Sequence, residues 1–275
     1  MAEPRRPHLL VAVAGTGTEI GKTWVTAAVA AALRDRGRTV GARKPAQSFE
    51  TDDGATDAHL LGAATGEDAH IVCPPHRWYP VPMAPPMAAA VLGRPALHIA
   101  TLRDEISGSW PPRADDIGFV ELAGGAASPL ASDGDAAALT AAIDPDMVVL
   151  VADAALGTIN AVRLSVGWLQ RAIAAPIHVH LNRYDNADPL HAANRDWLRF
   201  QDGLSVTDSV DELAQAVLAA APTFDPSTGL RRVGGTGDAD TLLEPPRFCP
   251  VCGRRVAVVV TPRSVRARCR LHGEL

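Results

Sequence analysis

The chain has 275 residues, of which 47% are hydrophobic, 21% charged and only 4% aromatic, and its formal net charge is −5 at pH 7. This length suits one large α/β domain, alone or with a small appendage. No apolar run approaches the ~20 residues that a membrane-spanning helix requires. Arginines at 5 and 6 and the apolar residues 9–14 mimic a signal peptide, but the apolar run is short and continues into a glycine-rich loop. We therefore expect a globular cytoplasmic protein with no membrane contact.

Strand and helix patterns alternate along the first 221 residues. The run at 9–14 is wholly apolar, which is typical of a strand buried on both faces of a parallel sheet. Further strands are predicted at 39–44, 117–121, 147–152 and 177–181, and helices at 24–36, 57–64, 87–92, 158–174 and 210–220. Strands that alternate with helices imply right-handed βαβ crossovers, so the sequence predicts an α/β fold with a doubly wound, mostly parallel sheet.

The composition changes after Ala221. Residues 222–247 are rich in Pro, Gly, Thr and Asp with little apolar content, which is typical of a flexible linker. Residues 248–275 then hold three of the four cysteines. The sequence predicts a main domain over 1–221, a linker over 222–247 and a small separate segment over 248–275.

A glycine- and threonine-rich turn lies between the first predicted strand and the first predicted helix. It reads Gly15-Thr16-Gly17-Thr18-Glu19-Ile20-Gly21-Lys22-Thr23, one residue longer between its outer glycines than the common Walker A pattern of P-loop proteins. Backbone N–H groups and the helix N-terminus favour a phosphate anion there. Lys22 is expected to reach the β- and γ-phosphate oxygens, and the Thr23 hydroxyl to bind Mg²⁺. We expect residues 17–23 to bind ATP; a glycine-rich turn without nucleotide is the alternative.

The lysines and two carboxylates point to the same site. Lys22 and Lys44 are the only lysines of the chain, and a lysine supplies a compact point charge that suits a phosphate oxygen in a tight site. Glu121 ends an apolar strand, at the sheet edge where open α/β sheets bind ligands. Asp57 begins a helix after a loop. Both are candidate Mg²⁺ ligands, and a surface helix cap is the alternative for Asp57.

These motifs resemble the dethiobiotin synthetase family over residues 8–221. The phosphate loop at 15–23 and the segment Glu121-Leu122-Ala123-Gly124-Gly125 carry the most specific matches. Further matches are Lys44-Pro45 with Ser48, Asp57, the proline-rich segment at 82–95, Leu156-Gly157-Thr158-Ile159-Asn160, and Asn182, which stands where the family has a base-contacting Asn.

The resemblance implies an ATP- and Mg²⁺-dependent ligase that carboxylates 7,8-diaminononanoate with CO₂ and closes the ureido ring of dethiobiotin. It implies catalytic roles for Lys22 and Lys44, and Mg²⁺ ligation by Thr23, Asp57 and Glu121. It also implies a homodimer in which the substrate is held by Ser48 and Gly124 of one subunit and by Gly157, Thr158 and Asn160 of the other, while Asn182 contacts the nucleotide.

Two bulky residues depart from the family pattern. Leu122 and Phe49 stand where the family has Gly, so side chains are expected where backbone normally approaches the substrate. A related P-loop ligase that acts on another amine or carboxylate is therefore an alternative. A third hypothesis is an ATP-binding regulator whose basic tail contacts nucleic acid. Thr16 stands where partitioning ATPases have a second lysine, which counts against that class.

The last cysteines have the spacing of a zinc ribbon. Cys249 and Cys252 form one pair, Cys269 and His272 form a second, and sixteen residues separate the pairs. Four protein ligands predict a structural Zn²⁺ site, without which so short a segment lacks the core to fold. Cys73 stands alone and is interpreted as an inert thiol.

The tail is also basic. From residue 247 onward it holds seven Arg against one acidic residue, a charge of +6, so the total of −5 leaves −11 for residues 1–246. Docking of the tail on its own acidic domain is favoured over nucleic-acid binding, because aromatic residues are not interleaved with the arginines.

Overall fold

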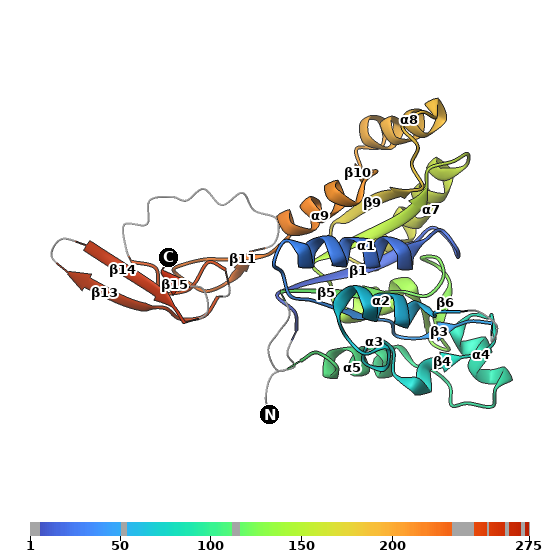
Figure 1. Ribbon diagram of the computed structural model, residues 1–275, viewed down its shortest axis with the longest axis horizontal. Coiled ribbons are helices and arrows are strands. Elements are labelled where there is room, and N and C mark those ends of the chain that lie inside the picture. The colour runs from blue at the N-terminus through green and yellow to red at the C-terminus, as the bar shows by residue number, and fades with distance from the viewer. Residues whose placement is uncertain are drawn as a thin grey trace. The chain divides into compact units, whose positions relative to one another are not determined.

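A six-stranded, wholly parallel sheet forms the centre of the first of two units into which the chain divides, residues 1–217 and 218–275 (Figure 1). The computed structural model describes residues 6–50, 54–111, 116–232, 245–251, 253–261, 264–270 and 273–274. The strand order is β10-β9-β8-β1-β5-β2. These strands are β1 (Leu9–Gly15), β2 (Val40–Arg43), β5 (Ile117–Glu121), β8 (Met147–Asp153), β9 (Ile177–Asn182) and β10 (Ser205–Thr207).

The central position of β1 follows from its composition. All seven of its residues are buried, and it pairs in parallel with β5 on one side and β8 on the other. Leu10, Ala12 and Ala14 belong to one large apolar cluster, whereas their buried neighbours along the strand lie outside it. Because successive side chains point to opposite faces, β1 is covered on both sides.

Helices cover both faces of this sheet, as expected of a doubly wound fold. Figure 1 shows α1 and α2 in front of the strands. The helices are α1 (Lys22–Asp35), α2 (Asp57–Thr65), α3 (Ala69–Val72), α4 (Pro85–Val91), α5 (Ile99–Gly108), α6 (Ala136–Ile143), α7 (Thr158–Gln170), α8 (Pro189–Asp196) and α9 (Val210–Ala219). Short elements complete the unit: the 3₁₀ turn Pro75–Arg77, the π-helix Trp197–Gln201, and the strand pairs β3 (Gln47–Ser48) with β4 (Trp78–Tyr79) and β6 (Pro129–Ala131) with β7 (Gly134–Asp135).

The predicted α/β fold with a parallel sheet is confirmed, and all five predicted strands belong to the central sheet. The sequence reasoning missed the sixth strand, β10, because three residues are too few to show a pattern. It also missed α3, α5, α6 and α8. The part of the chain that the structure describes contains no helix long and apolar enough to cross a membrane.

Two histidines on β9 are held without charge by their surroundings. His178 and His180 both approach the Thr207 hydroxyl of β10, at 3.2 and 3.1 Å. Burial lowers the pKa of each imidazole to about 4, helped by Arg199 for His178 and by His178 for His180. The native state therefore resists a protonation that the unfolded chain accepts at its ordinary pKa.

We accordingly predict an acid-sensitive fold. Between the unfolded pKa near 6.5 and the folded value the unfolded chain binds more protons, so stability is lost as the pH falls. From pH 7 to pH 5 the two imidazoles together cost about 2–4 kcal/mol. Urea unfolding of the native protein and of the double variant His178→Gln/His180→Gln at both pH values measures this. An equal loss in the two proteins would exclude the histidines as its source.

The second unit is an antiparallel β structure. Its three-stranded sheet consists of β13 (Ala257–Thr261), β14 (Ser264–Cys269) and β15 (Gly273–Glu274), with β14 in the middle. A strand pair, β11 (Thr223–Phe224) with β12 (Arg231–Arg232), belongs to the same unit. The Phe224 N–H donates to the Pro250 carbonyl at 2.8 Å, and the Arg247 N–H donates to the Pro226 carbonyl at 2.8 Å.

The predicted linker over 222–247 is therefore too long. Residues 223–232 are hydrogen-bonded to the segment at 247–250, so they belong to the second unit. Aromatic packing explains this, because Phe224 lies against Gly253 and Phe248 lies against Gly229 so closely that a Cβ on either glycine would clash. Phe224 and Phe248 were the available signal that this otherwise polar stretch packs into a folded unit, and its average composition hid them.

Candidate active site

The phosphate loop has the backbone geometry of an anion site. It runs from the end of β1 to α1, whose first turn begins after Gly21 in the left-handed conformation (φ 88°). Glu19 is also left-handed, with φ 60°. A Cβ on Gly15 would lie 2.7 Å from Ile20 and 2.9 Å from the Lys22 side chain, so glycine is required where the loop folds over its own start.

Lys22 lies along this loop. Its ammonium donates to the Gly17 carbonyl at 2.9 Å, and its side chain is buried. Burial, with Lys44 as a second cause, lowers the pKa of Lys22 to about 8. A phosphate anion would stabilise the charged form of such a poorly solvated ammonium, because the anion replaces the solvation that burial removed.

Lys44, Asp57, Glu121 and Thr23 form a single hydrogen-bonded cluster at the carboxyl edge of the sheet. The Lys44 ammonium lies 2.7 Å from Asp57 Oδ2 and 2.7 Å from Glu121 Oε1. The Thr23 hydroxyl lies 2.9 Å from Asp57 Oδ1 and 2.7 Å from Glu121 Oε1. Residues from the start of α1, the position after β2, the start of α2 and the end of β5 thus meet within hydrogen-bonding distance.

The charges of this cluster stabilise one another. Burial opposes the charge of Lys44, but Glu121 and Asp57 outweigh it and raise its pKa above the ordinary value. Burial likewise opposes ionisation of Asp57, and Lys44 and then the Thr23 hydroxyl outweigh it and lower its pKa. The site therefore holds Lys44 as a cation and Asp57 as an anion at neutral pH.

Asp57 is not a surface cap. The N-cap of α2 is Thr56, whose hydroxyl lies 2.9 Å from His59 Nδ1 in a reciprocal capping box. Asp57 is the first residue of the helix, and its carboxylate points to Thr23 and Lys44 instead. The capping alternative is thereby excluded.

The donor set fits a Mg²⁺ ion. Two carboxylates and a hydroxyl converge, which are hard oxygen ligands of the kind and number that Mg²⁺ uses beside a nucleotide phosphate. Glu121 is fully buried, and its Oε2 atom has no hydrogen-bond partner among the described residues. A buried carboxylate oxygen without a partner is costly, and a cation would satisfy it.

The end of β9 fastens the phosphate loop. Asn182 Nδ2 donates to the Ile20 carbonyl at 2.8 Å and lies over Gly21, where a Cβ would approach to 2.2 Å. The next residue, Arg183, donates to the Glu19 carbonyl at 2.8 Å and pairs with Asp153 at 3.2 Å. Arg183 adopts the left-handed conformation (φ 55°) to do so. The sequence reasoning missed Arg183, and its position directly after Asn182 was the available signal.

Removal of this fastening is expected to weaken nucleotide binding selectively. In the variant Arg183→Ala the loop loses a hydrogen bond to a strained residue, Glu19, so the KM for ATP should rise by about 3- to 10-fold. Turnover at saturating ATP should change little, because Arg183 contacts no group of the cluster around Lys44. Steady-state kinetics separates the two effects, and an unchanged KM with a lower kcat would contradict this role.

A cavity of about 580 Å³ adjoins the fastened loop. Gly21, Trp24, Asn182, Tyr184 and Asp208 contribute to its walls. Its aromatic and polar lining and its position behind the phosphate loop suit a nucleotide base. Asn182, predicted as a base contact, lies on its wall.

The predicted substrate residues occupy two places. Ser48 is on β3, and its buried hydroxyl has no partner among the described residues. Gly124 is left-handed (φ 72°), and the following Gly125 approaches the backbone of Gly17. The second place is the start of α7, where Gly157 is the N-cap and has a left-handed backbone.

At the second place, Thr158 is buried, and its hydroxyl has no partner among the residues that the structure describes, whereas Asn160 is exposed. Within the described residues, these groups have no hydrogen bond or ion pair with the Lys44 cluster. The Thr158 N–H donates to the Ala155 carbonyl at 3.3 Å.

The interpretation of Leu122 as a pocket-narrowing side chain is wrong. Leu122 is fully buried and belongs to the large apolar cluster of the core. It follows Glu121 directly, and its side chain packs in the core, whereas the Glu121 carboxylate contacts Lys44 and Thr23. Phe49 is half-buried and makes an edge-on contact with Trp78, with ring centroids 6.1 Å apart.

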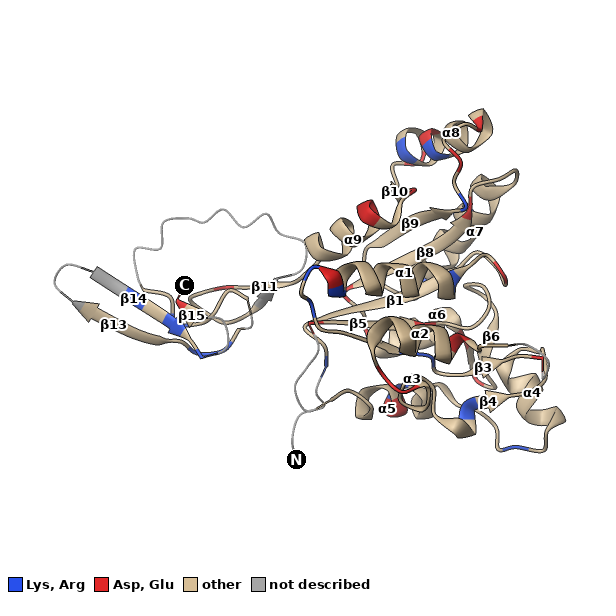
Figure 2. Cartoon of the chain, in the orientation of Figure 1, with Lys and Arg blue, Asp and Glu red and all other residues tan. Residues whose placement is uncertain are grey.

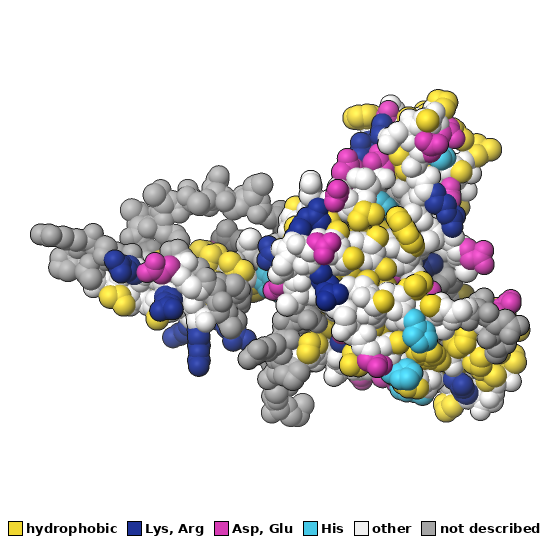
Figure 3. Space-filling view, in the orientation of Figure 1, with side chains coloured by type: hydrophobic (Ala, Val, Ile, Leu, Met, Phe, Trp, Pro, Cys, Tyr) yellow, Lys and Arg dark blue, Asp and Glu magenta, His cyan; other side chains and the backbone are white. Residues whose placement is uncertain are grey.

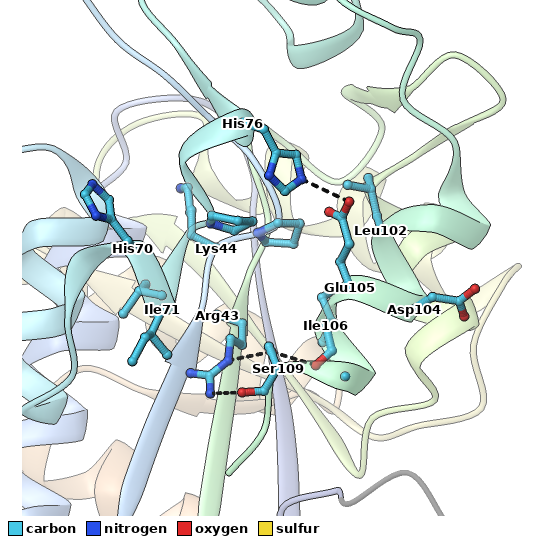
Figure 4. A pocket seen from close by; sticks show the side chains of 14 residues that line it. Arg43, Lys44, His70, Ile71, His76, Leu102, Asp104, Glu105, Ile106 and Ser109 are labelled. Atoms are coloured by element: carbon cyan, nitrogen blue, oxygen red, sulfur yellow. Dashed lines mark hydrogen bonds and ion pairs between the residues drawn. The ribbon is translucent and has the colours of Figure 1, made fainter. Parts of the chain in front are cut away.

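A separate cavity of about 480 Å³ lies beside the β2 end of the sheet (Figure 4). Its polar wall groups are already paired, Arg43 with Ser109 and His76 with Glu105. Lys44 contributes to the wall, but its ammonium binds Asp57 and Glu121, which do not line this cavity. We assign it no part in the site.

Four residues were predicted to bind zinc. Cys249 and Cys269 are buried in the second unit, whereas Cys252 and His272 lie outside the described residues. No group of three or more His, Cys, Asp or Glu residues that could hold a metal occurs in the described part of the chain.

Comparisons with known proteins identify the family of this chain. A family model described as an AAA domain, AAA_26, matches residues 10–220. The ATP-dependent dethiobiotin synthetase BioD of Rhodococcus jostii is 34% identical over 229 residues, which cover 81% of this chain and 96% of that protein. Its counterpart in Corynebacterium efficiens is 39% identical over 154 residues, 56% of this chain and 66% of that protein. A plasmid partition protein from Borrelia burgdorferi shows a weaker structural likeness, with a TM-score of 0.47 and 11% identity over 78% of this chain and 97% of that protein. The length and identity of the first match show that this chain belongs to the dethiobiotin synthetase family.

Proposed function

We propose that the protein forms dethiobiotin from 7,8-diaminononanoate, CO₂ and ATP. The observation that carries the proposal is the cluster of Thr23, Lys44, Asp57 and Glu121 beside the phosphate loop. The reaction transfers a phosphoryl group between two anions, and such chemistry depends on positioned cations more than on acid–base groups. This site offers two lysines and a place for a metal ion.

The proposed reaction has three steps. One amine of the substrate attacks CO₂ and loses a proton, which gives a carbamate. A carbamate oxygen then attacks the γ-phosphorus of ATP, and ADP leaves. Finally the second amine attacks the carbamoyl carbon, phosphate leaves, and the five-membered urea ring closes with loss of a proton.

The two lysines have different tasks in this scheme. Lys22 follows the loop toward the β- and γ-phosphates. Lys44 lies between Asp57 and Glu121, where its ammonium can neutralise the carbamate and the phosphoryl group in transfer. A bound Mg²⁺, which Thr23, Asp57 and Glu121 would hold, supplies further charge neutralisation on the phosphates.

We also propose that the protein acts as a homodimer. Ser48 and the backbone at Gly124 would position the carbamate, and the start of α7 in a partner subunit would bind the remote carboxylate of the substrate. Exposed apolar side chains support an interface there: Leu156 is 87% exposed, and Leu164 and Trp168 on α7 are 67% and 40% exposed. Patches of this kind mark protein contacts more often than free surface.

The test is direct. The purified protein is incubated with 7,8-diaminononanoate, bicarbonate, ATP and Mg²⁺, and dethiobiotin is followed by mass spectrometry together with ADP release. Omission of the diamine should abolish ADP release. ATP hydrolysis that does not depend on the diamine, without dethiobiotin, would point to another amine or carboxylate substrate and overturn the proposal.

We propose in addition that the second unit binds one structural Zn²⁺ through Cys249, Cys252, Cys269 and His272. Two described features support this. Gly253 and Gly273 each follow a cysteine by four residues and are left-handed (φ 66° and 80°), and the Gly253 N–H donates to the Cys249 carbonyl at 2.8 Å. Such tight turns bring backbone and side chains of a Cys-x-x-Cys or Cys-x-x-His segment around one ion.

The zinc proposal predicts a stoichiometry. Protein purified without chelator should contain about one zinc per chain, and the variant Cys249→Ser/Cys269→Ser should contain almost none, because each ligand pair loses a thiolate. Cys73→Ser is the matched control and should keep its zinc. Elemental analysis decides, and zinc retained by the double variant would place the metal elsewhere.

A further inference from the structure

The outer face of the three-stranded sheet carries a row of arginines. Along β14, Arg266 and Arg268 are exposed, whereas Ala267 and Cys269 between and after them are buried. Arg270 continues the same alternation just beyond the strand. Figure 2 marks basic residues along β14, and Figure 3 shows basic side chains projecting from this unit.

This face has little to neutralise it. Arg266 and Arg268 form no ion pair within the part of the chain that the structure describes. The register places Arg266 opposite Val259, which is 59% exposed, and Arg268 opposite Ala257 on one side and Glu274 on the other. Glu274 is thus the one acidic neighbour that the register gives to this row.

The spacing of the row matches a nucleic-acid backbone. Alternate residues of an antiparallel strand lie about 6.8 Å apart. Neighbouring phosphates of one nucleic-acid strand advance about 3.4 Å along the helix axis and also rotate around it, so their through-space separation is about twice that rise and is close to the spacing of alternate arginines. The planar guanidinium binds phosphate oxygens in a bidentate manner. A nucleic-acid strand presents phosphates at fixed intervals, whereas carboxylates on mobile side chains have no fixed spacing.

We propose that this arginine face, Arg266, Arg268 and Arg270, binds the sugar-phosphate backbone of nucleic acid. No aromatic side chain is among these residues, so the recognition is electrostatic, tolerant of sequence and strongly dependent on salt. This inference is independent of the proposed catalytic function, because none of the three residues belongs to the first unit.

The experiment uses the full-length, zinc-containing protein and labelled 20-mers of single-stranded DNA, duplex DNA and single-stranded RNA, with fluorescence anisotropy at several salt concentrations between ~50 and ~200 mM, the range over which salt strongly weakens binding to phosphates. We expect micromolar binding at the lowest salt. The variant Arg266→Gln/Arg268→Gln should weaken it by about tenfold and reduce the salt slope by about 2, one for each phosphate that an arginine no longer neutralises.

The matched control is Arg38→Gln/Arg103→Gln, which removes the same charge from exposed arginines of the first unit. It should bind as the native protein does, and circular dichroism and zinc content verify that the β14 variant is folded. Three results would overturn the proposal: no binding to any of the nucleic acids at ~50 mM salt, equally weakened binding in both variants, or equally tight binding of polyglutamate. Absent nucleic-acid binding together with a lower Tm of the β14 variant would instead show that the face docks on the protein's own acidic unit.

Discussion

Replacement of Lys44 by alanine is expected to lower turnover by at least ~10²-fold, the loss that follows removal of one charge partner of a transition state. Lys44 is the cation shared by Asp57 and Glu121, and its ammonium lies 2.7 Å from each carboxylate. Nucleotide affinity should stay closer to native, because Lys22 and the loop backbone bind the phosphates. Lys22→Ala should lower turnover as much and weaken ATP binding as well.

The two effects are separated by kinetics with a fluorescent ATP analogue as the binding probe. Removal of Lys44 also leaves the fully buried Glu121 without its cation, so the Tm of each variant is measured alongside. The isosteric Lys44→Met, which keeps the packing of the aliphatic chain, should show the same loss of turnover. Normal turnover in a folded Lys44 variant would refute the assigned role.

Leu122→Gly is expected to destabilise the protein by about 3–5 kcal/mol without an increase in turnover. A buried leucine reduced to its backbone loses apolar burial and leaves a cavity, and glycine adds backbone freedom to the unfolded chain. The sequence alone placed this side chain where backbone normally approaches the substrate, and its core position reverses that expectation.

Urea denaturation at neutral pH measures the stability, and the dethiobiotin assay measures turnover on the same preparations. Phe49→Gly is the matched control: its half-buried ring contacts Trp78 rather than the core, so the stability cost should be smaller. A stable Leu122→Gly enzyme with faster turnover would restore the crowding interpretation.

The site was more predictable from the sequence than the fold around it. Thr23 lies at the start of the helix that follows β1, and Glu121 ends β5. Because these strands are parallel neighbours, their meeting at one edge of the sheet was foreseeable. Asp57 was ambiguous because a carboxylate at a helix start serves as cap or ligand equally well. Only the position of Thr56 as the actual cap resolves it.

Other features depend on long-range packing that no local pattern encodes. Leu122 could not be placed from the sequence, since one residue after a strand end the alternation that decides its direction is no longer guaranteed. Arg183 acquires its contact with Glu19 through a left-handed backbone, a conformation rare for arginine and invisible in composition. The extent of the second unit was missed for the same reason, because Phe224 and Phe248 find their glycine partners across gaps in sequence.

The wide distribution of the site across the sheet has a consequence for how activity returns on refolding. The phosphate loop follows β1, Lys44 follows β2, Glu121 ends β5, and Asn182 ends β9. A slip of β5 by one residue would move Glu121 about 3.3 Å and turn it to the opposite face. No fragment that ends before β9 therefore contains the whole site, and we expect a partly folded chain to have no partial activity. During refolding, catalytic activity should therefore return only when the slowest long-range strand pairing is complete. It should return in one step, together with formation of the whole sheet.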